Sequence, residues 1–182
     1  MSKPAITRAF VEALPKTDLH VHLDGSIRIP TLIDLAREYQ VELPSYTEAG
    51  LRETVFKDRY ANLGEYLTGF AYTTAVLQSE LALERCAYEL AIDNQAEGVR
   101  YLEVRFAPQL HVHTHMNAVM VLRAVNRGLK RAQDNFNKQK AVTHGGEPGF
   151  RYGIIVCAMR MFQRGFSEYF RNLMDAHRYS PH

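Results

Sequence analysis

The chain has 182 residues, of which 46% are hydrophobic and 23% charged, and its formal net charge is +2. This mixture is typical of one globular domain with its own core, and the near-balanced charge without long runs of Lys or Arg argues against nucleic acid and membranes as partners. The first residues contain no apolar leader segment, and Cys86 and Cys157 lie too far apart for a zinc or disulfide motif. We therefore expect a cytoplasmic protein whose two thiols are buried apolar fillers.

The first strand is expected at residues 17–24, after a short, weakly helical lead-in. Along this stretch apolar residues alternate with aspartates and histidines, so an extended chain separates the two sets onto opposite faces. Imidazoles and carboxylates on one face are costly to bury unless a cation neutralises them, and neutral imidazole is a good zinc ligand. His20 and His22 are therefore candidate metal ligands, the alternative being two half-exposed histidines on a solvated strand. The apolar face would consist of Leu19, Val21 and Leu23.

Helices and two further strands are expected to alternate along the rest of the chain. The stretch between the first two of these helices is too long for a simple connection, and its helical periodicity predicts extra helices inserted after the first strand. Such an insertion would cover a site at the end of that strand. The first expected helix has Pro30 in its first turn and is ended by the stretch 41–46. The other expected elements are inserted helices within 46–79, a helix ending at Glu97-Gly98, a strand at 99–106, a helix over 121–136, a loop at 144–149, a buried strand at 152–159 and a helix at 165–177.

The second strand also alternates. Leu102, Val104 and Phe106 share one face, which predicts the core side, and Tyr101, Glu103 and Arg105 share the other. We expect Glu103 and Arg105 to be a structural inward pair, which either forms an ion pair or orients other groups of the site. A catalytic role is the alternative.

A second histidine alternation follows the second strand at His111, His113 and His115. Because it comes just after Pro108, we expect a loop there and no metal. If the first histidine pair fails as a metal site, this is the next cluster to test.

The first-strand stretch, Pro-Lys-Thr-Asp-Leu-His-Val-His-Leu-Asp-Gly-Ser at residues 15–26, resembles the signature of the adenosine deaminase family, a branch of the zinc-dependent amidohydrolases. The resemblance continues through residues 63–67, 84–89 and 98–108. It implies an α/β fold, namely the N-terminal portion of a TIM-type (α/β)8 barrel with about three βα units and the inserted helical region after strand 1. Residues 1–182 would then be the N-terminal part of one metal-dependent barrel domain, without its C-terminal strands.

This resemblance also implies a reaction, the zinc-dependent hydrolytic deamination of adenosine or deoxyadenosine to inosine or deoxyinosine and ammonia. His20 and His22 would bind one Zn²⁺, while His22 and Asp24 would contact the substrate and Asp24 would accept hydrogen bonds from the ribose. Aspartate at this position resembles the adenosine type, because relatives acting on adenine or aminofutalosine carry Glu there and a methylated-AMP branch carries Asn. A turn cap beside Gly25 is the alternative role of Asp24.

The groups that complete the chemistry in the family come from later strands: a third metal histidine, a proton-handling glutamate, a histidine near the attacking water and an aspartate. None has a counterpart here, so no catalytic residue is assigned and the general acid is expected C-terminal to this chain. Two explanations remain open. The chain is a segment of a zinc deaminase that a C-terminal half completes, or it is a truncated, non-catalytic paralogue; a different 6-aminopurine substrate is a further alternative.

Overall fold

The structure is a computed structural model that describes residues 6–159. Its strands β1 (Lys16–His22), β2 (Val99–Phe106) and β3 (Arg151–Val156) form one parallel sheet in the order β1-β2-β3. All three strand regions agree with the expected positions. The helix expected at 165–177 lies outside the described residues. The helices are α1 (Arg8–Ala13), α2 (Ile29–Glu38), α3 (Glu48–Thr54), α4 (Leu63–Val76), α5 (Glu80–Ala96), the 3₁₀ turn η1 (Pro108–Leu110), α6 (Ala118–Asn137) and α7 (Lys140–Thr143).

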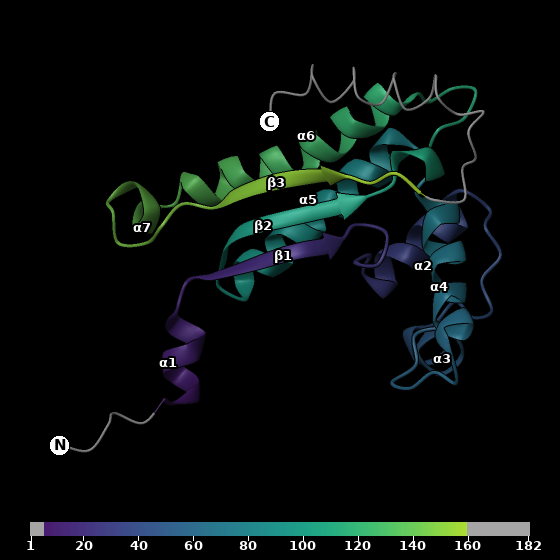
Figure 1. Cartoon of the computed structure of the whole chain (residues 1–182), viewed down its shortest axis with the longest axis horizontal. Helices are drawn as coiled ribbons and strands as arrows, with labels where there is room; N and C mark the ends of the chain where they lie inside the picture. Colours follow the sequence, from purple (N-terminus) through teal and green to yellow (C-terminus); the bar gives the residue numbers. More distant parts are fainter. Residues whose placement is uncertain (1–5, 160–182) are drawn as a thin grey trace.

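Helices α5 and α6 pack against each other and cover one face of the sheet (Figure 1). The expected core side of β2 is confirmed, because Leu102, Val104 and Phe106 are all buried. Each of the two helices begins at a polar side chain that accepts a hydrogen bond from the backbone of its first turn, Ser79 for α5 and Asn117 for α6. The apolar stripe predicted for the long helix is also confirmed, since its members are all buried: Val121, Leu122, Val125, Leu129, Ala132 and Phe136.

The α5–α6 contact is close because α6 carries a glycine at the crossing. A Cβ atom at Gly128 would lie 2.9 Å from the Tyr88 backbone nitrogen, 3.0 Å from the Ala87 Cβ and closer still to the Glu84 carbonyl oxygen. Backbone atoms of a packed helix have no room to move aside, so the two helices can approach this closely only with glycine at this position.

We expect Gly128→Ala to lower the free energy of unfolding by about 1–3 kcal/mol, because overpacking outweighs the better helix propensity of alanine. Gly69→Ala in α4 is the matched control: its Cβ would meet only side-chain atoms at 3.4 Å or more. That control should be neutral or gain up to about 1 kcal/mol. Urea unfolding of the three chains makes the comparison, and equal stabilities of the two variants would contradict the close crossing.

Strand β1 departs from the expected alternation at its centre. Its pairing with β2 shifts register between Asp18 and Val21, which places an extra residue in β1. Beyond the bulge Val21 packs against the core and Leu23 is fully buried, but Leu19 is 57% exposed. The prediction that Leu19 shares the buried face is therefore wrong, because alternation does not carry through a bulge.

Strand β3 is shorter and less buried than predicted. It ends at Val156, where residues up to 159 were expected in the strand, and its residues are half-buried or exposed. The apolar run Ile154-Ile155-Val156 predicted burial on both faces, but β3 is the edge strand of the described sheet. Within residues 6–159, no strand therefore pairs with its outer edge.

The inserted helices are confirmed and lie where they bear on a site. Helices α2, α3 and α4 gather near the carboxyl ends of the strands, whereas α1 projects from the start of β1 (Figure 1). Parallel sheets place their binding sites at the carboxyl ends of the strands. Within residues 6–159, no helix combines the length and apolar character that crossing a lipid bilayer requires.

Candidate metal and substrate site

The two candidate ligands of β1 lie side by side at the carboxyl end of the strand. The ring centroids of His20 and His22 are 5.9 Å apart and their planes meet at 65°. His20 has a φ of 65°, in the left-handed region that glycine favours, and it lies in the bulge between Asp18 and Val21. A strained backbone therefore presents the His20 ring beside His22, and such strain concentrates at functional sites.

This strain predicts an unusual order of stabilities. We expect the free energy of unfolding of His20→Gly to exceed that of His20→Ala by about 1 kcal/mol, because only alanine suffers in the left-handed region. Both variants lose the imidazole, so the difference reports the backbone alone. Leu19 is the control, since its φ is not positive; there the alanine variant should be the more stable. The same order at both positions would contradict a strained His20.

The polar groups next to the two ring nitrogens of His22 define its tautomer. Its Nε2 lies 2.6 Å from Arg105 Nη1, and its Nδ1 lies 3.7 Å from Asp24 Oδ1. A guanidinium can only donate, so Nε2 must carry the lone pair and Nδ1 the proton, which faces the carboxylate. Burial, together with the charge of Arg105, lowers the pKa of His22 and favours the neutral ring. Neutral imidazole with a free Nε2 lone pair is the form that binds a metal.

Asp24 lies next to Nδ1 of His22. It is 6% exposed, and its Oδ1 has no hydrogen-bond partner among the described residues. A metal-binding histidine commonly directs its second N–H toward a carboxylate, which fixes the ring. The donor set thus fits zinc in kind, although residues 6–159 contain no group of three or more His, Cys, Asp or Glu side chains able to hold an ion. His20 and His22 can supply only part of a zinc ligand set.

A pocket of about 120 Å³ opens beside Asp24 and Gly25, between the end of β1 and helix α4. Its wall is aromatic: the Phe70 ring centroid lies 6.1 Å from that of His22, Tyr66 lies 5.7 Å from Phe70, and Tyr60 lies 5.2 Å from Tyr66. Sequence reasoning named no residue of this wall. The four-residue spacing of Tyr66 and Phe70 on one helix was the available signal, but helix packing explains such spacing equally well.

A larger hollow, of about 690 Å³, lies at the opposite end of the sheet. It runs between the start of β1 and the loop after α5, and its charged lining includes Arg100, which pairs with Glu147. His20 and His22 line neither hollow. We place the site at the smaller pocket, because Asp24 lines it just after the carboxyl end of β1 and the ring of Phe70, another lining residue, lies next to that of His22.

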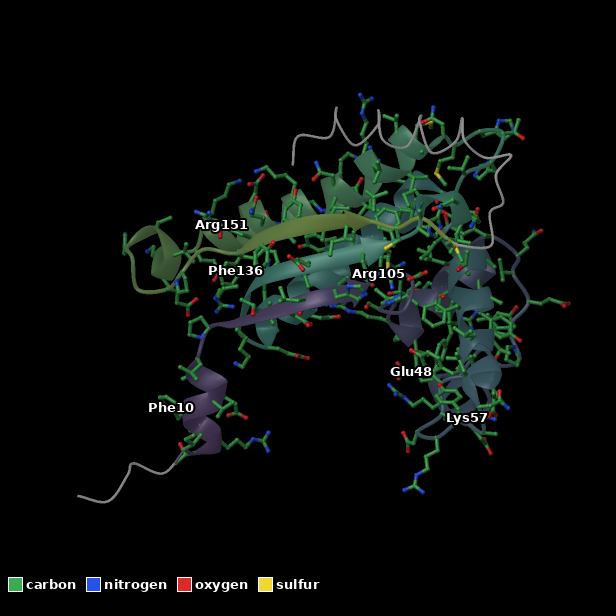
Figure 2. The ribbon with its side chains drawn as sticks, in the orientation of Figure 1. Phe10, Glu48, Lys57, Arg105, Phe136 and Arg151 are labelled. Atoms are coloured by element: carbon green, nitrogen blue, oxygen red, sulfur yellow. The ribbon has the colours of Figure 1, made fainter. Side chains whose placement is uncertain are left out.

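The inward residues Glu103 and Arg105 share a face of β2 but have different partners. Glu103 accepts a hydrogen bond from the Tyr101 hydroxyl at 3.1 Å, and burial together with this carboxylate raises the pKa of Tyr101. Arg105 contacts His22, and Figure 2 shows it near the carboxyl ends of the strands. The ion pairs within residues 6–159 do not include a Glu103–Arg105 pair. The structure thus favours the second expected role of Arg105, orienting another group of the site.

The two cysteines differ. Cys86 is buried as predicted, and burial raises the pKa of its thiol. Cys157 is only half-buried, and its Sγ accepts hydrogen bonds from Arg105 Nε at 3.1 Å and Nη2 at 2.9 Å. The prediction that Cys157 is a buried apolar filler is therefore wrong, because the end of β3 places it next to a guanidinium.

The second histidine cluster serves the fold. His111 is fully buried, and its Nδ1 donates to the Leu77 carbonyl at 2.9 Å. His113 Nε2 donates to the Gln78 carbonyl at 3.1 Å, while its Nδ1 accepts from the His115 backbone N–H at 3.3 Å. Both ring nitrogens of His113 are therefore engaged. These contacts join the segment after η1 to the connection between α4 and α5.

The chain is similar to known proteins over most of its length. Residues 15–180 match the family model described as adenosine deaminase. An adenosine deaminase of Vibrio atlanticus is 44% identical over 125 residues, which cover 69% of this chain and 38% of that protein. A probable adenosine deaminase of Dictyostelium discoideum is 39% identical over 164 residues, or 90% of this chain and 20% of that protein. The chain thus spans well under half the length of these relatives.

Solved structures share the fold. An adenine deaminase from Arthrobacter aurescens superimposes with a TM-score of 0.70 at 22% identity, covering 91% of this chain and 46% of its own. A zinc-bound amidohydrolase from Burkhoderia ambifaria gives 0.71 at 22% identity, covering 96% and 45%. The Arabidopsis N6-mAMP deaminase gives 0.69 at 24% identity, covering 93% and 48%. The three parallel strands and their helices correspond to the N-terminal portion of a TIM-type barrel, and the chain belongs to the adenosine deaminase family.

Proposed function

We propose that this chain forms the first-strand side of the active site of a zinc-dependent hydrolase that deaminates adenosine or deoxyadenosine. The observation that carries the proposal is the state of His22. It is neutral in its surroundings, keeps its lone pair on Nε2, lies beside His20 and directs Nδ1 toward a buried carboxylate.

His20 and His22 would hold the ion through ring nitrogens, with Asp24 fixing the His22 ring from behind. A bound zinc ion would supply the Lewis acidity that makes water a nucleophile near neutral pH. The remaining ligands and the proton-handling group are proposed to come from a C-terminal half, since the family relatives are much longer than this chain.

The aromatic pocket supports a purine substrate. Its wall offers flat apolar surfaces to a heterocycle, and the neighbouring carboxylate of Asp24 is suited to accept hydrogen bonds from a neutral sugar. A 5′-phosphate close to this buried carboxylate would be repelled, because two like charges in a poorly solvated site cost free energy. These features favour a nucleoside over a nucleotide.

A second candidate is a related 6-aminopurine deaminase. The fold is also that of an adenine deaminase and of an N6-mAMP deaminase, at identities that carry no information on substrate. Asp24 argues for the nucleoside, because its resemblance to the adenosine type agrees with its buried position. A truncated, non-catalytic paralogue is the remaining alternative. Such a protein would keep the fold, but it would have no use for a neutral His22 ring with its lone pair on Nε2.

The test uses the intact enzyme that contains this sequence, loaded with zinc. Adenosine, deoxyadenosine, adenine, AMP and N6-methyl-AMP are compared by kcat/KM, following the ultraviolet change on deamination. We expect a nucleoside to be preferred over every other substrate by at least about tenfold, the effect of one lost charge-assisted hydrogen bond. Preference for a nucleotide or for free adenine would refute the substrate assignment, and no turnover would favour the non-catalytic reading.

A further inference from the structure

Arg105 connects the ends of all three strands. Its Nη1 reaches His22 on β1, and its Nε and Nη2 reach the thiol of Cys157 just after β3. His22 and Arg105 are register partners in the sheet, so this contact is built into the strand pairing. No ion pair within residues 6–159 includes Arg105, and its guanidinium donates to His22 and to Cys157.

The contact with His22 uses one specific pair of electrons. A guanidinium has five donors and no acceptor, so Arg105 can bind His22 only through the lone pair of Nε2. A metal ion would bind His22 through that same lone pair, because Nδ1 carries the proton that faces Asp24. One lone pair cannot serve a guanidinium and a metal ion at once.

We propose that Arg105 competes with the metal for Nε2 of His22. This inference rests on the proposed function, because it assumes that His22 is a metal ligand. The guanidinium holds the His22 ring in the tautomer that the metal needs. Metal binding then requires the guanidinium to leave Nε2, and its two donors to Cys157 keep it nearby. Two histidines alone would therefore bind metal weakly.

The proposal predicts that removing the guanidinium strengthens metal binding. Zinc is titrated into the 182-residue chain in competition with a chromophoric chelator. Arg105→Met, which keeps the apolar stem, should bind zinc at least about tenfold more tightly, as expected from the loss of one competing charge-assisted hydrogen bond. Arg100→Met is the matched control on the same strand. Arg100 pairs with Glu147 and stacks on Phe136, away from His22, so its zinc affinity should equal that of the unmodified chain.

Zinc affinity of Arg105→Met that is unchanged or weaker, with its circular dichroism spectrum intact, would overturn the proposal. A different failure identifies the proposed function as the error: His20→Ala and His22→Ala chains that bind zinc as tightly as the unmodified chain would show that the metal site lies elsewhere.

A second measurement does not depend on whether an Arg105 variant folds, because it uses the unmodified chain. In the unmodified chain labelled with ¹⁵N, zinc should shift the His22 ring signals and the Arg105 side-chain signals over the same range of zinc concentration. Saturation of the His22 shift with no movement of the Arg105 signals would also overturn the proposal, because the guanidinium would then not have been displaced.

Discussion

His22→Ala in the intact enzyme is expected to remove zinc and to lower kcat/KM for adenosine by more than about a hundredfold, the upper range for losing only an outer-shell partner of a metal ligand. The physical reason is that a metal ion would bind the lone pair on Nε2 of His22. Arg105 now donates to this lone pair, and the Nδ1 proton on the other side of the ring faces Asp24. Zinc content by atomic absorption and adenosine turnover are measured on the same preparation.

His113→Ala is the control for this experiment. His113 belongs to the other histidine cluster, and both its ring nitrogens are engaged by backbone groups. Its loss should leave zinc content unchanged. Full zinc occupancy in His22→Ala, or loss of zinc in His113→Ala, would contradict the assignment of the ligands.

Asp24→Asn in the intact enzyme is expected to change the choice of substrate. The amide keeps the shape of the side chain but removes its charge, so kcat/KM for adenosine should fall by about ten- to a hundredfold, the equivalent of a charge-assisted hydrogen bond. Turnover of AMP should fall less, because repulsion of the 5′-phosphate is relieved at the same time. The ratio of kcat/KM for AMP to that for adenosine should therefore rise.

Two controls accompany the Asp24 variant. Zinc content is measured first, because Asp24 also faces Nδ1 of His22 and its loss weakens the metal site. Asp34→Asn removes an exposed carboxylate that pairs with Arg85, and it should leave the substrate ratio unchanged. A ratio that does not rise in zinc-loaded Asp24→Asn would contradict contact between Asp24 and the sugar.

Periodicity predicted the strands and the covering helices well, because these depend on regular patterns. The alternation of Leu102, Val104 and Phe106 predicted the buried face of β2, and the apolar stripe predicted the buried face of α6. The burial predictions were wrong at a bulge and at the edge of the sheet. Leu19 is exposed because a bulge interrupts β1, and β3 is half-buried because it lies at the edge of the described sheet.

The candidate site was predictable only in its first-strand part. His20, His22 and Asp24 stand close together in the sequence, and their side-chain types carry metal and hydrogen-bonding chemistry. The contacts that define the site are long-range: Arg105 reaches both His22 and Cys157 across neighbouring strands, and Phe70 approaches His22 from an inserted helix. No local pattern encodes such distances, so Cys157 was misread and the aromatic wall was not named.

Anomalous diffraction at the zinc edge, from crystals of the zinc-loaded intact enzyme that contains this sequence, tests the central claim most directly. The account predicts a peak about 2.0–2.1 Å from Nε2 of His22 and from a ring nitrogen of His20. A peak at His113 and His115, or loaded crystals without density beside His20 and His22, would contradict it.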